Sequence, residues 1–260
     1  MFVNWMTVMA ALLSVLAFRW VFERVSQWPA RRRLAYLFPA LVLALPGLSF
    51  AFYYLHLIPD HAWYFEFRSW PGTEILMVFV AVFVALVASF LPRWMMVFAL
   101  LGVIGTSMIP TLKPLLGPIP DENFKEQWNG RVCTQSTPST CGPSAAASAL
   151  RTLGIEASER DLARESHSSS RGTEAWYLAR AIRARGVRAK FSQGPGFDPS
   201  VPLPAIYGVQ INDFGHFIAI LEVDNGTYVV GDPLNGEERL SAEALLQRYE
   251  FSGFSLSVRK

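Results

Sequence analysis

Long apolar runs fill the first part of the chain, at residues 2–18, 34–57, 75–91 and 94–109. A helix needs about 20 apolar residues to cross a bilayer, with a usable range of about 17–25. The runs are nearly uncharged all the way round, which favours membrane spans over helices buried in a soluble protein. We therefore predict an all-α transmembrane region of about four helices at residues 1–111. Tryptophans lie near the run ends, as expected at a membrane interface: Trp5, Trp20, Trp63, Trp70 and Trp94.

Arginines are unevenly distributed among the connections between these runs. Arg93 separates the third run from the fourth, whereas Arg68 lies between the second and third runs beside acidic residues. The positive-inside rule places arginine-rich connections in the cytoplasm. With four spans, everything after the fourth run then faces the periplasm or the cell exterior. Five arginines lie between the first and second runs: Arg19, Arg24, Arg31, Arg32 and Arg33.

The chain changes character near residue 120. Because proline interrupts helices and stiffens spacers, the prolines that follow the fourth run predict a linker at residues 112–124. The residues beyond it carry charges, glycines and short apolar segments, and they suffice for one globular domain with its own core. We place this domain at residues 125–260. The prolines in question are Pro110, Pro114, Pro118 and Pro120.

The globular part shows helical patterns first and strand patterns later. Small residues from Gly142 to Leu153 predict a helix that stops at Gly154. Ser158, with Asp161 three positions on, resembles a capping box at the start of a second helix. This order predicts an α+β domain with an antiparallel sheet. Further helices are predicted at residues 173–185 and 241–249, and strands at 187–191, 205–209, 216–223, 228–230 and 254–258.

Composition narrows the range of functions. The formal net charge is +2 and no basic stripe alternates with aromatic residues, so nucleic acid is not a predicted partner. The dispersed ligand-type residues predict no metal or other cofactor. The two cysteines, Cys133 and Cys141, are too few for a disulfide framework. A cysteine in a special local context is therefore a candidate nucleophile.

Cys141-Gly142-Pro143 opens the first predicted helix of the globular part. Proline suits a first helical turn, where its missing N–H costs nothing. The partial positive charge at a helix N-terminus stabilises a thiolate and lowers the thiol pKa, and the thiolate is the nucleophile. The alternative for a lone cysteine is an unreactive buried side chain. The position at the helix start favours the nucleophile.

A cysteine nucleophile needs an imidazole that takes and returns protons. His216 opens an apolar strand beside Gly215, where a substrate can reach it, and it is the predicted acid and base. The other histidines lie at the membrane edge or in a serine-rich turn: His56, His61 and His167.

Asp232 ends the next strand and is the candidate that orients the imidazole, although an aspartate before proline can also be a simple turn former. Hairpin parity decides whether the two side chains meet. With a two-residue Asn-Gly loop, Asp232 faces Ala219, on the opposite side of the sheet from His216. A triad therefore predicts a three-residue loop at residues 224–226 that ends in a bulge, or else a bulge at Gly231.

Two further positions bear on this site. Gln135 precedes Cys141 by six residues, and its side-chain amide could donate to a developing oxyanion beside the backbone N–H of Cys141. Cys133 precedes Cys141 by eight residues, so an oxidising compartment could join the two and block the nucleophile. The alternative for Cys133 is a partly buried free thiol.

Together, Gln135-Ser-Thr-Pro-Ser-Thr-Cys141-Gly-Pro-Ser-Ala, Gly215-His216-Phe217 and Gly231-Asp232-Pro233 resemble the C39 peptidases. These are papain-like domains that cleave double-glycine leader peptides and are often fused to ABC exporters. The resemblance covers about residues 125–260. It implies a papain-like fold, with Cys141 as nucleophile, His216 as acid and base, Asp232 as orienting group and Gln135 as oxyanion donor.

The resemblance also implies a bacterial inner-membrane or plasma-membrane protein with a peptide or protein substrate. The chain differs from the exporters in two ways. It lacks the Gly-x-x-x-x-Gly-Lys-Ser/Thr nucleotide-binding motif, and its peptidase part follows the predicted membrane spans. The main hypothesis is a membrane-anchored cysteine peptidase. The alternatives are a non-catalytic peptide-binding module that assists a separate transporter or secretion partner, and an acyltransferase or amidase with the same Cys, His and Asp chemistry.

Overall fold

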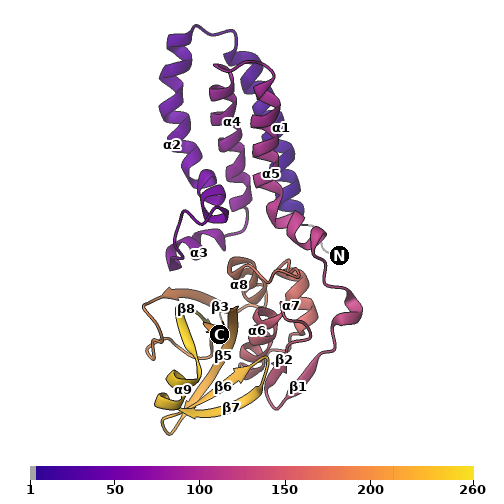
Figure 1. The fold of residues 1–260 in the computed structure, drawn as a ribbon, viewed down its shortest axis with the longest axis vertical. Helices are drawn as coiled ribbons and strands as arrows, with labels where there is room; N and C mark the ends of the chain where they lie inside the picture. The colour runs from indigo at the N-terminus through magenta and orange to yellow at the C-terminus, as the bar shows by residue number, and fades with distance from the viewer. Residues whose placement is uncertain (1–3, 213) are drawn as a thin grey trace. The chain divides into compact units, whose positions relative to one another are not determined.

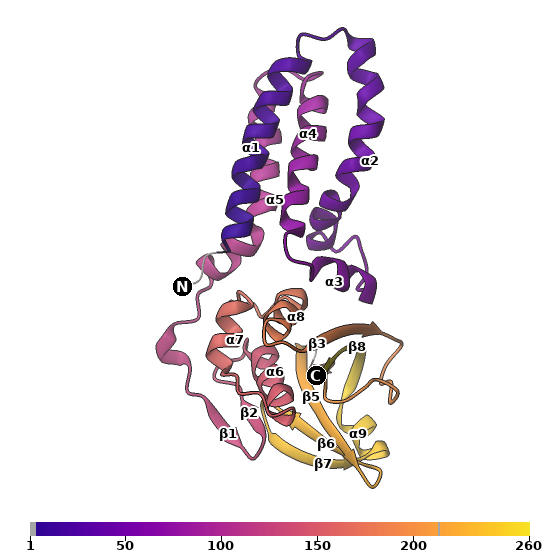
Figure 2. The same ribbon diagram turned by 180° about the vertical axis from the view of Figure 1, so that it is seen from behind.

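The computed structural model describes residues 4–212 and 214–260, and these residues divide into two compact units (Figure 1, Figure 2). One unit contains residues 4–59 and Pro71–Leu112 and is helical. The other contains Asp60–Trp70 and Lys113–Lys260 and combines helices with β-sheet. The second unit thus includes a short piece of chain from between two apolar helices.

The helical unit is built from long apolar helices. Among the described residues, three helices are long and apolar enough to cross a membrane, and the bent pair Ala62–Arg68 and Thr73–Ala88 would make a fourth span. Membrane association, predicted from the apolar runs, is thereby supported for three or four helices. The elements are α1 (Trp5–Val25), α2 (Ala30–Tyr54), the 3-10 turn η1 (Thr73–Leu76), α4 (Met77–Ala88) and α5 (Met95–Leu116).

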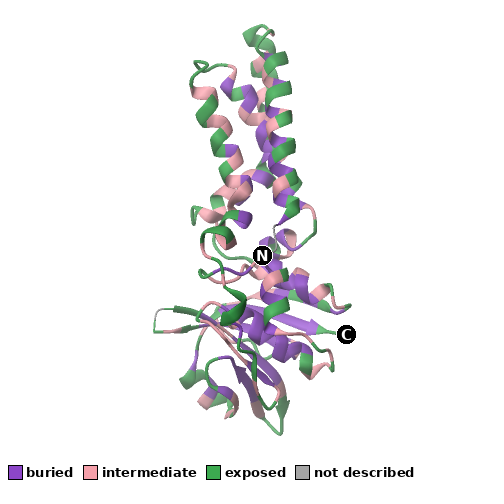
Figure 3. Cartoon of the chain, turned by 90° about the vertical axis from the view of Figure 1, so that its right-hand side faces the viewer, coloured by how far each residue is buried: buried purple, intermediate pink, exposed green. Residues whose placement is uncertain are grey.

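Small residues line the contacts within this unit, while many large apolar residues are exposed (Figure 3). Ala44, Ala81 and Ala85 are fully buried, whereas Phe38 is 73% exposed. At Gly47 an added Cβ would lie 2.6 Å from the carbonyl oxygen of Leu76, so α2 needs glycine to approach so closely. Small residues at helix contacts and apolar ones outside are typical of membrane helices.

Prolines lie inside two of the apolar helices. Pro39 and Pro46 lie inside α2, and α5 continues through Pro110 and Pro114 to Leu116. The prediction that the fourth helix stops near Ile109 was therefore wrong in its boundary. In apolar surroundings the backbone has no water to bond to, so the helix continues past a proline at the cost of the hydrogen bond that this residue cannot donate.

The other unit contains a six-stranded antiparallel sheet in the order β3-β8-β4-β5-β6-β7, beside a two-stranded sheet of β1 and β2. This confirms the predicted α+β class with an antiparallel sheet. The strands are β1 (Gln127–Asn129), β2 (Val132–Thr134), β3 (Arg188–Gln193), β4 (Ala205–Ile211), β5 (Phe214–Asp224), β6 (Thr227–Asp232), β7 (Gly236–Ser241) and β8 (Glu250–Arg259).

Helices cover both faces of the large sheet. Tyr207, Ile218 and Ile220 alternate along β4 and β5 and pack in one core cluster with Leu245 of α9. On the other face, α6 is buried along Gly142–Leu150, as its run of small residues predicts. The helices are α6 (Cys141–Thr152), α7 (Glu159–Glu165), α8 (Ala175–Arg183) and α9 (Ala242–Arg248), with a 3-10 turn η2 (Asp121–Asn123).

Helix α3 (Ala62–Arg68) belongs to the α+β unit although it lies between two apolar helices in the sequence. Phe65 is 4% exposed, and its ring centroid lies 5.6 Å from those of Phe191 and Phe254 and 6.3 Å from that of Trp176. This aromatic contact makes α3 part of the hydrophobic core of the unit.

Two arginines of α8 bind the C-terminal end of α3. Arg180 Nη2 donates to the carbonyl oxygens of Arg68 and Trp70, at 2.7 Å each. Arg183 forms an ion pair with Glu66, with 2.7 Å between Nη2 and Oε1. A cation at the last carbonyls of a helix satisfies their hydrogen bonds and interacts favourably with the helix dipole.

The aromatic contact predicts that Phe65→Ala destabilises the α+β unit by about 3–5 kcal/mol, the usual cost of emptying a buried phenylalanine site. In a Cys141→Ala background of the full chain in detergent, the buried Cys133 is the single thiol, so its labelling against urea reports unfolding of this unit. The matched control is Trp63→Ala on the same helix, because Trp63 is 64% exposed. Equal labelling midpoints for the two variants would contradict the role of Phe65.

Candidate active site

Cys141 is the first residue of α6, directly after Thr140 at the N-cap position. The first N–H groups of a helix have no partner within the helix, and they carry its partial positive charge. The side chain is partly exposed, as a nucleophile must be. A Cβ at Gly142 would meet its neighbours at ordinary distances, 3.4 Å from Leu178 and 3.5 Å from Phe217, so packing alone does not require glycine there.

His216 lies on β5 and Asp232 ends β6, the neighbouring strand. His216 Nε2 lies 2.9 Å from Asp232 Oδ1, and the two residues are 8% and 0% exposed. Cys141 is close enough to the ring to raise the pKa of His216. The structure therefore brings the predicted nucleophile, base and orienting acid together in one place.

His216 and Asp232 lie on the same face of the sheet, but the register shift that places them there differs from the one that we predicted. The hairpin has a two-residue turn, because Asp224 pairs with Thr227 and Asn225 and Gly226 both have positive φ. The three-residue loop was therefore wrong. An irregularity at Leu221, between the pairs that involve Ile220 and Glu222, shifts the register instead.

This bulge has the effect that a three-residue loop would have had. Below it Ala219 pairs with Gly231, so one further step along both strands places Asp232 opposite Ile218. Side chains alternate along a strand, so Ile218 and His216 share a face. Asn-Gly favours the tight two-residue turn, whose positive φ angles suit these two residues, and the extra residue is therefore accommodated within β5.

Asp232 is surrounded by hydrogen-bond donors. Besides His216, its carboxylate accepts from the N–H of Leu234 at 2.9 Å, from Asn235 Nδ2 at 2.7 Å and from the Tyr249 hydroxyl at 2.9 Å. Sequence reasoning missed Asn235 and Tyr249. The contact to Leu234 is an Asx turn, for which Asp-Pro-Leu is a local signal, but Tyr249 comes from beyond α9 and left no local signal.

Burial and hydrogen bonding act in opposite directions on this pair. Burial alone would raise the pKa of Asp232, but its donors, His216 first, hold that pKa down at about 2. Burial likewise lowers the pKa of His216, but Asp232 and Cys141 outweigh it and raise that pKa from 6.5 to about 9. Both shifts favour the charged forms of the pair, an aspartate and an imidazolium.

Gln135 lies just after β2, in the loop that leads to Cys141. Its backbone N–H donates to the carbonyl oxygen of Pro233 at 2.9 Å, and its side-chain Nε2 donates to the carbonyl oxygen of Thr137 at 2.9 Å. An amide nitrogen has two N–H groups, so one remains for a ligand. The loop thereby connects the candidate oxyanion donor to the residue that follows Asp232.

Residues 129–260 match the model of the Peptidase C39 family, which is half of the chain. The chain belongs to the peptidase C39 family. It is 31% identical over 114 residues, 42% of this chain, to an uncharacterized protein of Methanothermobacter marburgensis and covers 75% of that protein. It is also 25% identical to the probable functional amyloid protease FapD of Pseudomonas fluorescens, over 48% of this chain and 59% of FapD.

Solved structures similar to the C39 domain come from transporter-associated peptidases. One is a double glycine motif protease from an AMS/PCAT transporter in complex with the leader peptide, with TM-score 0.43 and 20% identity over 49% of this chain and 89% of that one. Another is the peptidase domain of Streptococcus ComA, with TM-score 0.42 and 21% identity over 48% of this chain and 95% of that one.

Cys133 of the C39 domain is a core residue. It lies on β2 with no exposed surface, and its backbone N–H donates to Ser148 Oγ on α6 at 2.9 Å. Burial, with the charge of Glu159 adding to it, raises the pKa of the thiol to about 12. Both cysteines are free. The structure thus matches the free-thiol alternative, with deeper burial than we expected.

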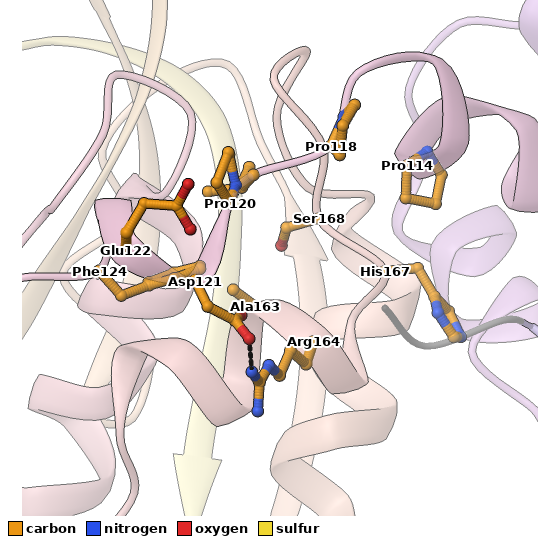
Figure 4. Close-up of a pocket in the computed structure, with 11 residues that line it drawn as sticks. Pro114, Pro118, Pro120, Asp121, Glu122, Phe124, Ala163, Arg164, His167 and Ser168 are labelled. Carbon is orange, nitrogen blue, oxygen red and sulfur yellow. Dashed lines mark hydrogen bonds and ion pairs between the residues drawn. The ribbon is translucent and has the colours of Figure 1, made fainter.

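A separate pocket lies where the proline-rich segment meets α7 (Figure 4). Its volume is about 290 Å³, and the ion pair between Asp121 and Arg164 lies at its wall. The predicted site residues do not line it. Residues 113–124 are thus docked on the C39 domain, and the pocket is a gap under this docked segment.

The pKa shifts predict the effect of Asp232→Asn. Without the carboxylate, burial dominates and the pKa of His216 falls well below about 9, whereas Asp224→Asn at the exposed hairpin tip leaves it unchanged. The measurement is the pH titration of ¹⁵N-histidine resonances of the full chain in detergent, with the His216 signal assigned by its loss in His216→Gln. An unchanged His216 titration in Asp232→Asn would contradict the coupling.

The same shifts predict two pH limits for stability. The contribution of Asp232 is present above pH 3.8 and is lost as the pH falls toward 2. The contribution of His216 is present below pH 6.5 and is lost as the pH rises through about 9. In the Cys141→Ala chain, which keeps Asp232 and His216, we expect the urea midpoint of Cys133 labelling to fall as the pH rises from 6 to 9.5, measured with a thiol label whose reaction does not depend on pH. A His216→Gln variant should lack the alkaline decline.

Proposed function

We propose that the chain is a membrane-anchored cysteine peptidase in which Cys141, His216, Asp232 and Gln135 carry the reaction. The observations that support this most directly are the hydrogen bond of His216 with Asp232 and the effect of Cys141 on the pKa of His216, where Cys141 opens a helix in a C39-family domain. All four positions are filled by residues that can perform the chemistry. This counts against a module that only binds peptides.

The reaction begins with the protonated imidazole beside the cysteine. A positive His216 stabilises a negatively charged Cys141 sulfur, which attacks the carbonyl carbon of the peptide bond. The carbonyl oxygen becomes an oxyanion that accepts from the Gln135 amide and the Cys141 backbone N–H. His216 then gives its proton to the leaving amine, and a thioester remains on Cys141.

The second half of the reaction regenerates the enzyme. His216, now neutral, takes a proton from a water molecule whose oxygen attacks the thioester carbonyl. The carbon–sulfur bond breaks, the carboxylic acid product leaves, and the thiolate and imidazolium are restored. Asp232 keeps the ring in the orientation and tautomer that both halves require.

The anchor bears on which side of the membrane the domain occupies. Residues 60–70 and 113–260 form one unit, so both must lie on the same side, and the chain between them must cross an even number of times. Because α5 has the length and hydropathy of a span, Thr73–Ala88 must then also cross. The 4 residues of the 3-10 turn and the 12 residues of α4 together measure about 26 Å, somewhat short of a bilayer core of about 30 Å.

Four spans favour an outward-facing domain. The arginine-rich connection between α1 and α2, and Arg93 between α4 and α5, then lie together on the side opposite to α3 and the C39 domain. The positive-inside rule places that side in the cytoplasm. We propose that the peptidase domain faces the periplasm or cell exterior, where its substrates would be secreted or membrane-proximal peptides.

The catalytic proposal predicts that a thiol-directed peptide electrophile labels Cys141 of the folded chain at neutral pH. His216→Ala should slow this labelling roughly 100-fold, within the range of general acid–base effects. Cys133 should react after denaturation, because it is buried in the fold. Mass spectrometry of the labelled peptides distinguishes the two sites, and an unreactive Cys141 would favour a binding module.

The topological proposal predicts that alkaline phosphatase fused after Lys260 is active in a bacterial host, whereas green fluorescent protein fused there is dark. A fusion at the connection between α1 and α2 should give the opposite result and serves as the control. The same fusions placed between α2 and α3 should behave like those after Lys260. A fluorescent C-terminal fusion would show that the domain is cytoplasmic.

A further inference from the structure

We propose that Glu159 is a positioning residue for catalysis, which holds the segment that carries the oxyanion donor. This inference rests on the proposed function. The segment, residues 135–140, is called the oxyanion loop below, and it runs from β2 to the start of α6. Glu159 lies on α7, outside the predicted site.

Glu159 is a fully buried carboxyl group directed at the oxyanion loop. Its Oε1 accepts from the backbone N–H of Ser136 at 2.7 Å, and its Oε2 accepts from the Ser136 hydroxyl. The same hydroxyl oxygen accepts from the N–H of Lys125 at 2.9 Å. Both carboxyl oxygens are therefore engaged by the residue next to Gln135.

Hydrogen bonds within the oxyanion loop connect its residues to one another. A displacement of Ser136 therefore also displaces the side-chain amide of Gln135. The carbonyl oxygen of Thr137 accepts from Gln135 Nε2 at 2.9 Å, from the backbone N–H of Thr140 at 3.2 Å and from the Thr140 hydroxyl at 3.0 Å. Thr140 is the N-cap of the helix that begins with Cys141. The side-chain amide of Gln135 thus depends on the path of this loop.

Two fixed points hold the loop from outside. At one point the N–H of Gln135 donates to Pro233, which follows the orienting acid. At the other, Glu159 holds Ser136 against α7. With both in place, the Gln135 amide is fixed before substrate arrives, which is the condition under which an oxyanion donor is effective.

Different substitutions at Glu159 have different consequences. Alanine leaves the Ser136 N–H without its acceptor, so the loop must move to find water. Glutamine has the same shape, accepts from that N–H through Oε1 and donates to the hydroxyl oxygen through Nε2. Glu159→Gln should therefore rescue most of what Glu159→Ala loses.

The experiment compares two reagents on the full chain in detergent. Iodoacetamide alkylates Cys141 when the sulfur displaces iodide, and this reaction forms no oxyanion. p-Nitrophenyl acetate acylates Cys141 through attack on a carbonyl, which forms an oxyanion before p-nitrophenolate leaves and a thioester remains. The ratio of acylation rate to alkylation rate therefore reports the oxyanion donor separately from the state of the thiol.

We expect Glu159→Ala to lower this ratio about tenfold, a part of the 10²–10³ that loss of a complete oxyanion donor costs. Gln135→Ala should lower it at least as far, and the double variant should match Gln135→Ala alone, because Glu159 acts through Gln135. Glu159→Gln should stay close to the unsubstituted chain. The matched control is Glu165→Ala on the same helix, where the carboxylate pairs with Arg185 and the ratio should not change.

Other outcomes would overturn the inference. If Glu159→Ala slows alkylation and acylation equally, Glu159 only stabilises the fold. Additive losses in the double variant would show that it does not act through Gln135. If Gln135→Ala leaves the ratio unchanged while Glu159→Ala lowers it, the oxyanion role of Gln135 fails and with it the route proposed for Glu159. An unreactive Cys141 in the unsubstituted chain would instead refute the proposed function itself.

Discussion

The candidate site depends on one buried carboxylate, that of Asp232. A charged carboxylate without solvent contact is costly unless donors surround it. Here the donors come from β5, from the turn after β6 and from the residue that follows α9. The next residue along, Pro233, binds the backbone of Gln135. Asp232 and the residue that follows it thereby hold the imidazole ring and one end of the oxyanion loop.

The way His216 and Asp232 meet illustrates what strand periodicity can and cannot predict. Their separation in the sequence showed that a simple two-residue hairpin would place them on opposite faces, and that some offset was required. The offset lies at Leu221, inside an unbroken apolar segment of β5. A buried bulge of this kind has no distinctive residue, because any apolar side chain can occupy it. The need for a bulge was predictable, but its place was not.

Much of the rest of the C39 domain was predictable from local signals. Helices α6, α7 and α9 begin within one residue of the predicted positions. Ser158 accepts the backbone N–H bond that its capping box predicted, and Ser241 caps α9 in the same way. Strand β7 was missed because its sequence, Gly-Glu-Glu-Arg-Leu-Ser, is polar. An edge strand pairs through its main chain and leaves such side chains in solvent. Tyr249 and Glu159 were missed because their partners are distant in the sequence.

Helix α3 was the larger omission from the sequence analysis, and it bears on the proposed membrane anchor. Its aromatic residues resemble those of a membrane interface, and Trp63 is indeed exposed, yet Phe65 completes the core of the C39 domain. Phe254, which contacts Phe65, also contacts Phe217 beside His216, with ring centroids 5.4 Å apart. The domain core thus includes a residue placed before two of the apolar helices. For the proposed membrane anchor, it follows that the C39 domain cannot be complete until the connection between α2 and α4, which carries Phe65, has reached the side that the domain occupies.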